Sequence, residues 1–156
     1  MDNSHGGFFR ANVYVENIDA SRRDVDHPIQ IICNNNSSSV LGGAGKDTIL
    51  GDLANDILRG GKGDDCITGG SGNDTLRPQT SFQGWETTLY GGAGNDVFYC
   101  HREFDPTNII LDYTEGEDII RFGNRMYITS YSIDGFDVFA TFKTNVSGCG
   151  WEIITA

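Results

Sequence analysis

A nine-residue repeat in the middle of the chain constrains the fold more than any other feature. Four blocks follow one another without a gap, and a fifth comes after an interruption at residues 78–90. The blocks read GGAGKDTIL, GDLANDILR, GGKGDDCIT, GGSGNDTLR and GGAGNDVFY, at residues 42–50, 51–59, 60–68, 69–77 and 91–99. Fourteen of the 21 glycines and seven of the 16 aspartates lie between the first block and the last. The unusual composition therefore belongs to one segment of the chain.

Each position of the block has its own physical role. Glycine at positions 1, 2 and 4 lets the backbone take positive φ and turn sharply. Position 8 is always a large apolar residue, and its two neighbours would point to the opposite face of a short strand. The block therefore predicts a six-residue turn and a three-residue strand with one inward side chain. Position 6 is Asp47, Asp56, Asp65, Asp74 and Asp96, and position 8 is Ile49, Leu58, Ile67, Leu76 and Phe98.

One block cannot close a coil, but two blocks can. The pattern therefore predicts an all-β, right-handed parallel β-roll (a β-solenoid), with a strand on each side of every coil and coils stacked ~4.8 Å apart. Blocks 1 and 3 would share one edge and blocks 2 and 4 the other, and the interruption is long enough to replace a block and return block 5 to the second edge. The expected same-edge pairs are Asp47 with Asp65, Asp56 with Asp74, and Asp74 with Asp96.

Charge and residue type together favour calcium as the partner of these turns. Carboxylates and turned-in carbonyls form an oxygen-only ligand set, which suits Ca²⁺ and its six to eight oxygen ligands. The formal net charge of −11 disfavours nucleic acid and anionic membranes, and no segment approaches the ~20 apolar residues of a membrane-spanning helix. Three same-edge pairs and two end sites would hold three to five ions. Asp52 and Ala54 replace glycine in block 2, which predicts a weaker site at Asp56.

The blocks match the nonapeptide G-G-x-G-x-D-x-U-x, and the chain resembles the RTX family: the calcium-binding C-terminal modules of secreted bacterial proteases, lipases and cytolysins, and the R-modules of mannuronan C5-epimerases. Residues 109–120 resemble the strand, acidic turn and strand that often follow the β-roll in this family. The resemblance implies a secreted, extracellular protein that leaves the cell by type I secretion. It also implies that turn carbonyls join the position-6 carboxylates around each ion, from Gly43, Gly45, Gly61, Gly63, Gly70, Gly72, Gly92 and Gly94.

The flanks are expected to cap the roll. Residues 1–41 would form N-terminal strands and a cap, residues 42–99 the calcium-binding roll with its insertion, and residues 100–156 a C-terminal antiparallel β cap that carries a secretion signal. Val40 fits the inward position one register before block 1, and Ile31 fits it two registers before, so the coil would begin ahead of the recognisable repeat. Further expectations are a strand at residues 8–15, a hairpin of residues 127–133 and 136–142 about Asp134-Gly135, and a tail at residues 151–156 that covers an open strand edge.

No catalytic site is predicted. None of the three histidines lies in an H-E-x-x-H motif, and no G-x-S-x-G motif is present. Acid pairs such as Asp64-Asp65 are better explained as solvated turns or calcium ligands than as a glycosidase pair. The four cysteines, Cys33, Cys66, Cys100 and Cys149, form no C-x-x-C pair and allow three complete disulfide pairings, among which the sequence does not choose. The plain interpretation of Cys66 is a small, half-buried strand residue.

The leading interpretation is a non-enzymatic calcium-binding module that folds on binding Ca²⁺ outside the cell. Arg59, Arg77 and Tyr99 share outward position 9 on the second edge and should stack as a ladder. Ordinary exposed strand residues are the plain explanation of this ladder. The R-module resemblance implies instead contact with an anionic, alginate-like polysaccharide, as in an accessory module of a carbohydrate-active enzyme. In a third interpretation, a roll with imperfect caps self-associates end to end as a subunit of an extracellular filament, matrix or adhesin.

Overall fold

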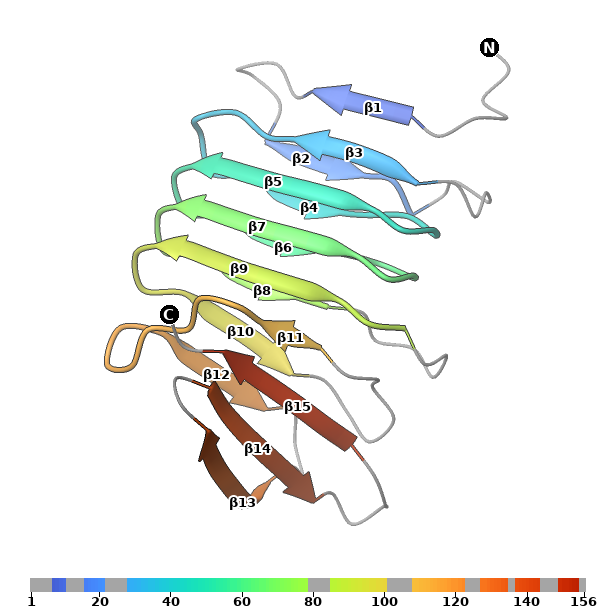
Figure 1. Ribbon diagram of the computed structural model, residues 1–156. Coiled ribbons are helices and arrows are strands. Elements are labelled where there is room, and N and C mark those ends of the chain that lie inside the picture. The colour runs from blue at the N-terminus through green and yellow to red at the C-terminus, as the bar shows by residue number, and fades with distance from the viewer. Residues whose placement is uncertain are drawn as a thin grey trace.

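The chain forms two facing columns of β-strands, seen in a computed structural model (Figure 1). The structure describes the backbone of residues 7–10, 16–21, 28–78, 85–100, 108–122, 127–134, 137–143 and 149–154, and the side chains of residues 16–21, 28–78, 85–99 and 108–121. Within these ranges every regular element is a strand, and no helix long and apolar enough to cross a membrane is found there. The predicted all-β architecture is confirmed.

Strands alternate between two sheets along the chain. The first sheet contains, in spatial order, β1 (Gly7–Arg10), β3 (Ile29–Ile32), β5 (Thr48–Leu53), β7 (Cys66–Ser71), β9 (Thr88–Ala93), β11 (Ile109–Ile110), β15 (Cys149–Ile154), β14 (Asp137–Lys143) and β13 (Tyr127–Asp134). The second contains β12 (Ile119–Phe122), β10 (Val97–Cys100), β8 (Thr75–Arg77), β6 (Ile57–Arg59), β4 (Ser39–Leu41) and β2 (Asn17–Asp19). From β1 to β11 and from β2 to β12, neighbouring strands pair in parallel. The chain thus crosses between the sheets twice in each coil of the predicted parallel roll.

The strand register keeps equivalent block positions in line. Ile49 pairs with Ile67, and Ile67 pairs with Leu89, in the first sheet. Blocks 1 and 3 supply strands to this sheet, and blocks 2, 4 and 5 supply the second, where Leu58, Leu76 and Phe98 are aligned. The strand β9 follows the insertion and takes the place of a block in the first sheet. The predicted assignment of blocks to the two edges is therefore confirmed.

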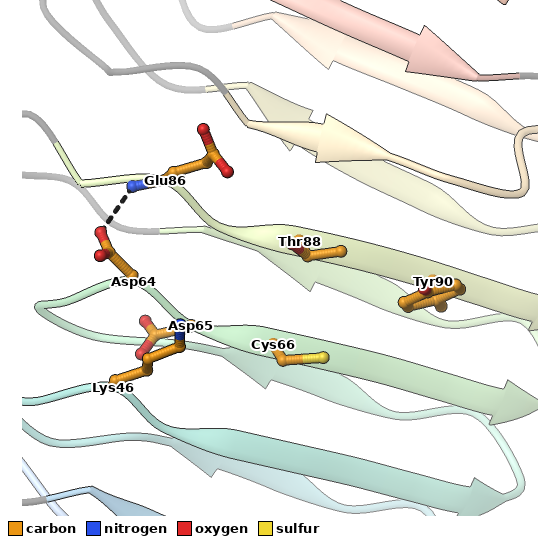
Figure 2. Close-up of a pocket in the computed structure, with 7 residues that line it drawn as sticks. All are labelled: Lys46, Asp64, Asp65, Cys66, Glu86, Thr88 and Tyr90. Atoms are coloured by element: carbon orange, nitrogen blue, oxygen red, sulfur yellow. Dashed lines mark hydrogen bonds between the residues drawn. The ribbon is translucent and has the colours of Figure 1, made fainter.

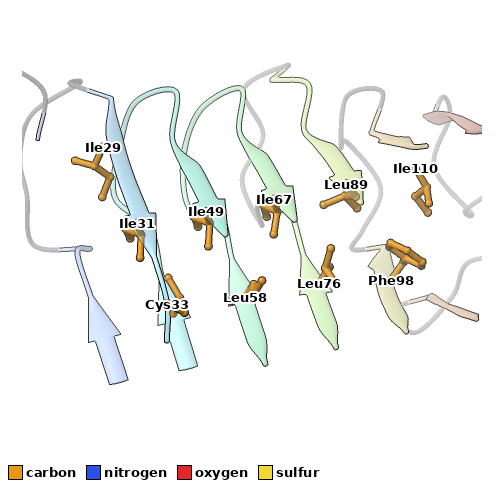
Figure 3. Close-up of a cluster of buried hydrophobic side chains, with 11 residues drawn as sticks. Ile29, Ile31, Cys33, Ile49, Leu58, Ile67, Leu76, Leu89, Phe98 and Ile110 are labelled. Atoms are coloured by element: carbon orange, nitrogen blue, oxygen red, sulfur yellow. The ribbon is translucent and has the colours of Figure 1, made fainter. Parts of the chain in front are cut away.

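The core consists of two facing rows of apolar side chains, one from each sheet (Figure 3). One residue of each strand points inward because side chains alternate between faces along a strand. Burying each of these large side chains stabilises the fold by about 1.5–3 kcal/mol. The inward residues are 0–1% exposed: Ile31, Ile49, Ile67, Leu89 and Ile110 on the first sheet, and Val40, Leu58, Leu76 and Phe98 on the second. The burial of Ile31 and Val40 confirms that the coil begins before the repeat.

The C-terminal strands extend the first sheet past the end of the roll. The strands β13 and β14 form the predicted antiparallel hairpin, and β15 pairs antiparallel with β14 and parallel with β11. The tail therefore covers that edge of the first sheet, as expected. Each strand boundary beside the predicted turn lies one residue later than expected, because β13 ends at Asp134 and β14 begins at Asp137, which pairs with it.

The strand predicted at residues 8–15 is described only as β1, which pairs with β3, and residues 11–15 lie outside the described part of the chain.

Candidate metal centre

Six turns of the roll carry a buried aspartate at their sixth position. They are residues 42–47, 51–56, 60–65, 69–74, 91–96 and 113–118, named turns 1 to 6 in chain order. Turns 1 and 3 lie on the first edge, where they lead into β5 and β7. Turns 2, 4, 5 and 6 lie on the second edge, where they lead into β6, β8, β10 and β12. The six aspartates, Asp47, Asp56, Asp65, Asp74, Asp96 and Asp118, are 0–7% exposed.

One oxygen of each carboxylate ties neighbouring coils together. The Oδ1 atom accepts the backbone N–H of the residue at the equivalent position one coil earlier. The donor and acceptor residues, with N···O distances, are Ile29 and Asp47 (3.0 Å), Asp47 and Asp65 (2.9 Å), Ser38 and Asp56 (2.6 Å), Asp56 and Asp74 (2.7 Å), Asp74 and Asp96 (2.8 Å), and Asp96 and Asp118 (2.9 Å). The three same-edge pairs expected from the sequence are therefore brought together.

The other oxygen is left without a partner in four of the turns. The Oδ2 atoms of turns 2 to 5 are buried and accept no hydrogen bond. The four aspartates are at most 2% exposed, so water does not reach them freely. Leaving a buried acceptor unsatisfied costs about 1–3 kcal/mol, and more when the group is charged. Such atoms are usually explained by a functional role. The recurrence of this orphaned oxygen at one position, in Asp56, Asp65, Asp74 and Asp96, suits a bound cation.

Burial raises the pKa of the aspartates predicted to bind metal. Loss of hydration is the largest cause, and it raises the pKa of Asp56 and of Asp65 to about 7 and that of Asp96 to about 6, while backbone hydrogen bonds act in the opposite direction. The pKa values of Asp47 and Asp74 rise for the same reason. A carboxylate in such a place is stabilised by taking up a proton or by a nearby cation.

The backbone of the turns explains the glycine pattern. In turns 3 to 5 the residues at positions 2 and 4 are glycines with φ between +97° and +139°, a region that L side chains rarely adopt. In turn 2 the same positions hold Asp52 and Ala54, at φ +77° and +78°. Turn 2 therefore keeps the common shape, at a strain of about 1–2 kcal/mol for each residue.

Glycine at position 1 serves a different purpose, which is close approach. A Cβ atom on Gly69 would collide with Oδ2 of Asp74 in its own turn and with the carbonyl oxygen of Gly91 in the next coil. A Cβ on Gly51 would collide in the same way with Asp56 and with the carbonyl oxygen of Gly69. A carboxylate oxygen and a carbonyl oxygen thus flank one small space, which only a residue without a side chain leaves open.

The donor set decides which cation would fit. In the part of the chain whose side chains are described, no three His, Cys, Asp or Glu side chains gather around one point. A cation in these turns must therefore complete its shell with backbone carbonyls. Such an all-oxygen shell of irregular shape suits Ca²⁺, whereas Zn²⁺ prefers nitrogen and sulfur ligands.

The sequence predicted an acidic turn between two strands at residues 109–120, but it did not predict that this turn, turn 6, keeps the register of the blocks. Residues 113–121, YTEGEDIIR, keep Gly116, Asp118 and Ile120 at positions 4, 6 and 8, but they lack the opening glycines. The spacing was the available signal, because Asp118 follows Asp96 by 22 residues, as Asp96 follows Asp74. The structure places turn 6 directly beyond turn 5 on the second edge.

The predicted ladder on the outer face of the second sheet is present and longer than expected. Arg59 pairs with Arg77 between β6 and β8, and the guanidinium of Arg77 lies 4.0 Å from the centroid of the Tyr99 ring. Arg121, which was not predicted, pairs with Tyr99 between β10 and β12. Its guanidinium lies 6.0 Å from the ring centroid and donates a hydrogen bond of 3.3 Å to the Tyr99 hydroxyl. The side chains of the ladder are therefore in contact, as predicted, and the function of this contact stays a prediction.

A pocket of about 250 Å³ lies on the outer face of the first sheet (Figure 2). Its lining comes from turn 1, turn 3, β7 and the start of β9: Lys46, Asp64, Asp65, Cys66, Glu86, Thr88 and Tyr90. Cys66 is a half-buried free thiol, as predicted, and burial raises its pKa, so it is not an activated thiolate. Cys33 is also free, and burial raises its pKa to about 11. The side chains of Cys100 and Cys149 lie outside the described residues, so a disulfide pairing stays open.

Comparison with known proteins identifies the repeats. Residues 41–76 and 88–99 match the family model of the RTX calcium-binding nonapeptide repeat, in four copies. No curated protein and no solved structure matches the chain. The matched residues contain turns 1 to 5 together with the strands that these turns connect. These matched residues are therefore RTX calcium-binding nonapeptide repeats, and their strands pair as a parallel β-roll.

Proposed function

We propose that this chain is a module of a secreted protein whose roll folds outside the cell when Ca²⁺ binds to turns 2 to 5. The observation that carries the proposal is the set of four buried carboxylate oxygens with no hydrogen-bond partner, in Asp56, Asp65, Asp74 and Asp96. These carboxylates, with carbonyl oxygens of the same turns, would hold the ions. The secreted location is supported by the repeat family, whose members are typically secreted proteins.

The mechanism is thermodynamic linkage. An ion that binds only the folded roll stabilises it by RT ln(1 + [Ca²⁺]/Kd) per site. With the Kd of ~10⁻⁴ to 10⁻³ M typical of extracellular modules, millimolar calcium contributes about 0.4–1.4 kcal/mol at each independent site. Each site alone is weak, but the Oδ1 hydrogen bonds join successive turns on one edge. Folding should therefore be steep in calcium concentration, because neighbouring sites order one another.

The test is a calcium titration followed by far-ultraviolet circular dichroism. We expect low strand content in a chelator, a steep gain of strand signal between 0.1 and 10 mM calcium on the order of the Kd above, and little gain with Mg²⁺, which demands a stricter octahedral geometry. Equal strand content with chelator and with calcium would contradict the proposal.

Turn 3 offers a matched pair of variants for the same titration. Asp65→Asn removes the charge of a buried carboxylate, whereas Asp64→Asn removes one charge from the exposed neighbouring residue. The amide oxygen introduced by Asp64→Asn can still accept the N–H of Glu86, as Oδ1 of Asp64 does at 2.8 Å. We expect Asp65→Asn to raise the calcium concentration at the folding midpoint and Asp64→Asn to leave it nearly unchanged. Equal shifts would show that net charge, and not the buried site, controls folding.

A second candidate function is binding of an anionic polysaccharide to the outer face of the second sheet. The supporting observation is the run Arg77, Tyr99 and Arg121, in which two guanidinium groups stack on one ring. Stacked arginines and tyrosines can bind carboxylate groups and sugar rings together. A triple variant with Ala at positions 59, 77 and 121 should lose retention on an alginate column in calcium, while Lys46→Ala on the other sheet keeps it. Retention that survives the triple variant would remove this candidate.

A further inference from the structure

Turns 1 and 6 differ from the four turns between them in the hydrogen bonding of their aspartates. In turn 1, Oδ2 of Asp47 accepts the N–H of Gly43 at 2.9 Å, and in turn 6, Oδ2 of Asp118 accepts the N–H of Thr114 at 2.8 Å. In both turns the donor stands at position 2 and the acceptor at position 6. Turns 2 to 5 make no such bond, because their Oδ2 atoms have no partner.

The backbone conformation at position 2 separates the same two groups of turns. The position-2 residue has positive φ in turns 2 to 5, with values of +77°, +106°, +115° and +97° for Asp52, Gly61, Gly70 and Gly92. Neither Gly43 nor Thr114 has positive φ, whereas position 4 has positive φ in all six turns, including Gly45 and Gly116. Two independent properties of the turn, the φ at position 2 and the bonding of Oδ2, therefore agree turn by turn.

An aspartate closed in this way is a poor cation ligand. Its Oδ2 already accepts an N–H, and the positive end of that N–H dipole points into the space beside the carboxylate. A cation in that space would be attracted less strongly by the carboxylate, whose charge is partly neutralised by the N–H group. It would also be repelled by the positive end of the N–H dipole. In turn 6 both oxygens of Asp118 are taken, since Oδ1 accepts the N–H of Asp96.

A second carboxylate of the sixth coil is used in the same manner. Asp112 stands just before turn 6, and its two oxygens accept the N–H groups of Gly91 and Gly92 at 2.9 and 2.8 Å. Gly91 and Gly92 are the first two residues of turn 5, which is the last turn with an orphaned Oδ2. Asp112 therefore satisfies the two backbone N–H groups at the start of that turn. Asp112 and Asp118 thus both accept hydrogen bonds from backbone amides of the roll.

We propose that calcium occupies only turns 2 to 5, and that turns 1 and 6 are metal-free closing turns whose aspartates are held by backbone N–H groups. The inference rests on the proposed calcium binding at turns 2 to 5 and goes beyond it in excluding ions from turns 1 and 6 and in stating what closes these two turns. It replaces the sequence-based expectation of a metal ligand at Asp47, and it gives Asp112 and Asp118 the role of capping the calcium column without ions.

The test counts bound ions by native mass spectrometry of the whole chain in calcium, with folding followed by circular dichroism. We expect four ions on the unmodified chain, one for each orphaned oxygen. Asp96→Asn should hold three. Asp118→Asn makes the same chemical change one coil further along the same edge, and it should keep four ions while folding at a higher calcium concentration. Asp47→Asn, at the other end of the roll, should likewise keep four.

The unmodified chain separates the two proposals even if a variant fails to fold. Five or six ions on it, or the loss of one ion in Asp118→Asn or Asp47→Asn, would overturn the assignment of closing turns and leave calcium binding intact. No bound calcium at all would overturn the proposed function itself.

Discussion

The two edges of the roll share one coil geometry but differ in the residue at the sixth turn position. On the second edge the sixth turn position is aspartate in four successive coils, from turn 2 to turn 6. On the first edge it is aspartate only in turns 1 and 3. Thr87 and Asn108 then take the place, because each precedes the residue that continues the strand register in β9 and β11. Both are buried, at 1% and 2% exposure.

The comparison shows that the residue at the sixth turn position can serve two separate purposes, hydrogen bonding between coils and cation binding. A carboxylate has one oxygen for the N–H of the coil before it and a second oxygen for a cation, whereas a threonine hydroxyl supplies a single oxygen. The coil can therefore continue through Thr87 without a metal site. The first edge would then contain calcium only near turn 3, and the second edge along three successive turns.

The largest expected effect comes from adding a side chain at position 1 of a turn on the second edge, where the backbone of the next coil lies too close for a Cβ atom. Gly69→Ala would drive a Cβ into Asp74 and into backbone of the next coil, and it should cost about 3 kcal/mol or prevent folding. Gly116→Ala is the control, because a Cβ there meets nothing within 4 Å and only its φ of +88° is unfavourable, at about 1 kcal/mol. Urea unfolding in calcium measures both. A similar loss for the two variants would argue that backbone strain alone sets the glycine requirement.

The next effect tests the two purposes directly. Asp74→Ala removes the acceptor for the Asp56 N–H and the orphaned oxygen, so it should cost about 2–3 kcal/mol in saturating calcium. Thr87→Ala at the equivalent place on the first edge should cost about 1 kcal/mol by loss of its hydroxyl. The two variants also differ in calcium response, since only Asp74→Ala should lower the steepness of the folding titration. Equal steepness in both would show that the two edges do not differ in metal binding.

A fall in pH should stabilise the metal-free roll and reduce the further stabilisation that calcium gives it. Burial holds the pKa of Asp56 and Asp65 at about 7 and that of Asp96 at about 6, above the ordinary value near ~3.9 of an unfolded chain. The metal-free folded roll therefore binds more protons than the unfolded chain between these values, so its stability is highest at acid pH and is lost as pH rises toward 7. Protons compete with calcium for these carboxylates, so the extra stabilisation that saturating calcium gives the roll should become smaller when pH falls from 7.5 to 5.5.

Circular dichroism of the metal-free chain between pH 4 and 8 checks the first half of this prediction. Thermal unfolding with and without saturating calcium at the two pH values checks the second. Strand content that increases with pH in the absence of metal would contradict the sign.

The smallest effect concerns the strain in turn 2. Asp52→Gly and Ala54→Gly should each stabilise the calcium-loaded roll, because glycine adopts their positive φ without strain. The gain should be no more than about 1 kcal/mol, because glycine also raises the entropy of the unfolded chain, which opposes folding. Ala44→Gly at position 3 of turn 1, where φ is not positive, is the control and should be neutral or destabilising. Thermal unfolding measures the differences. Destabilisation by both turn 2 variants would mean that their side chains make contacts worth more than the strain.

The repeat predicted most of the roll because its spacing carries geometric information. The inward positions of Ile49 and Leu58, the pairing of Asp74 with Asp96 across the insertion, and the earlier start of the coil at Ile31 all follow from a period of nine with two blocks per coil. These features depend on the backbone path alone, and the backbone path follows from the glycines and the apolar positions.

The bonding state of each carboxylate could not be predicted in this way. Asp47 and Asp65 occupy the same position in similar blocks, yet Oδ2 of Asp47 accepts a hydrogen bond and Oδ2 of Asp65 does not. The difference lies in the φ of a glycine, which either value allows, so the residue type leaves it open. The register of turn 6 was not predicted for a related reason, because the spacing of Asp118 was kept while the opening glycines that make a repeat visible were replaced.

A core built from the same two facing positions in every coil has a consequence for how the roll can lengthen. Inward residues such as Leu58 lie between the same position of the coils before and after, so each coil gains most of its stability from its two neighbours. The system then behaves as a one-dimensional array, in which units can be added in the middle without redesigning the interior. Duplicating residues 51–68 should yield a longer roll with the same ends, and its unfolding transition should become sharper as the number of coupled coils grows.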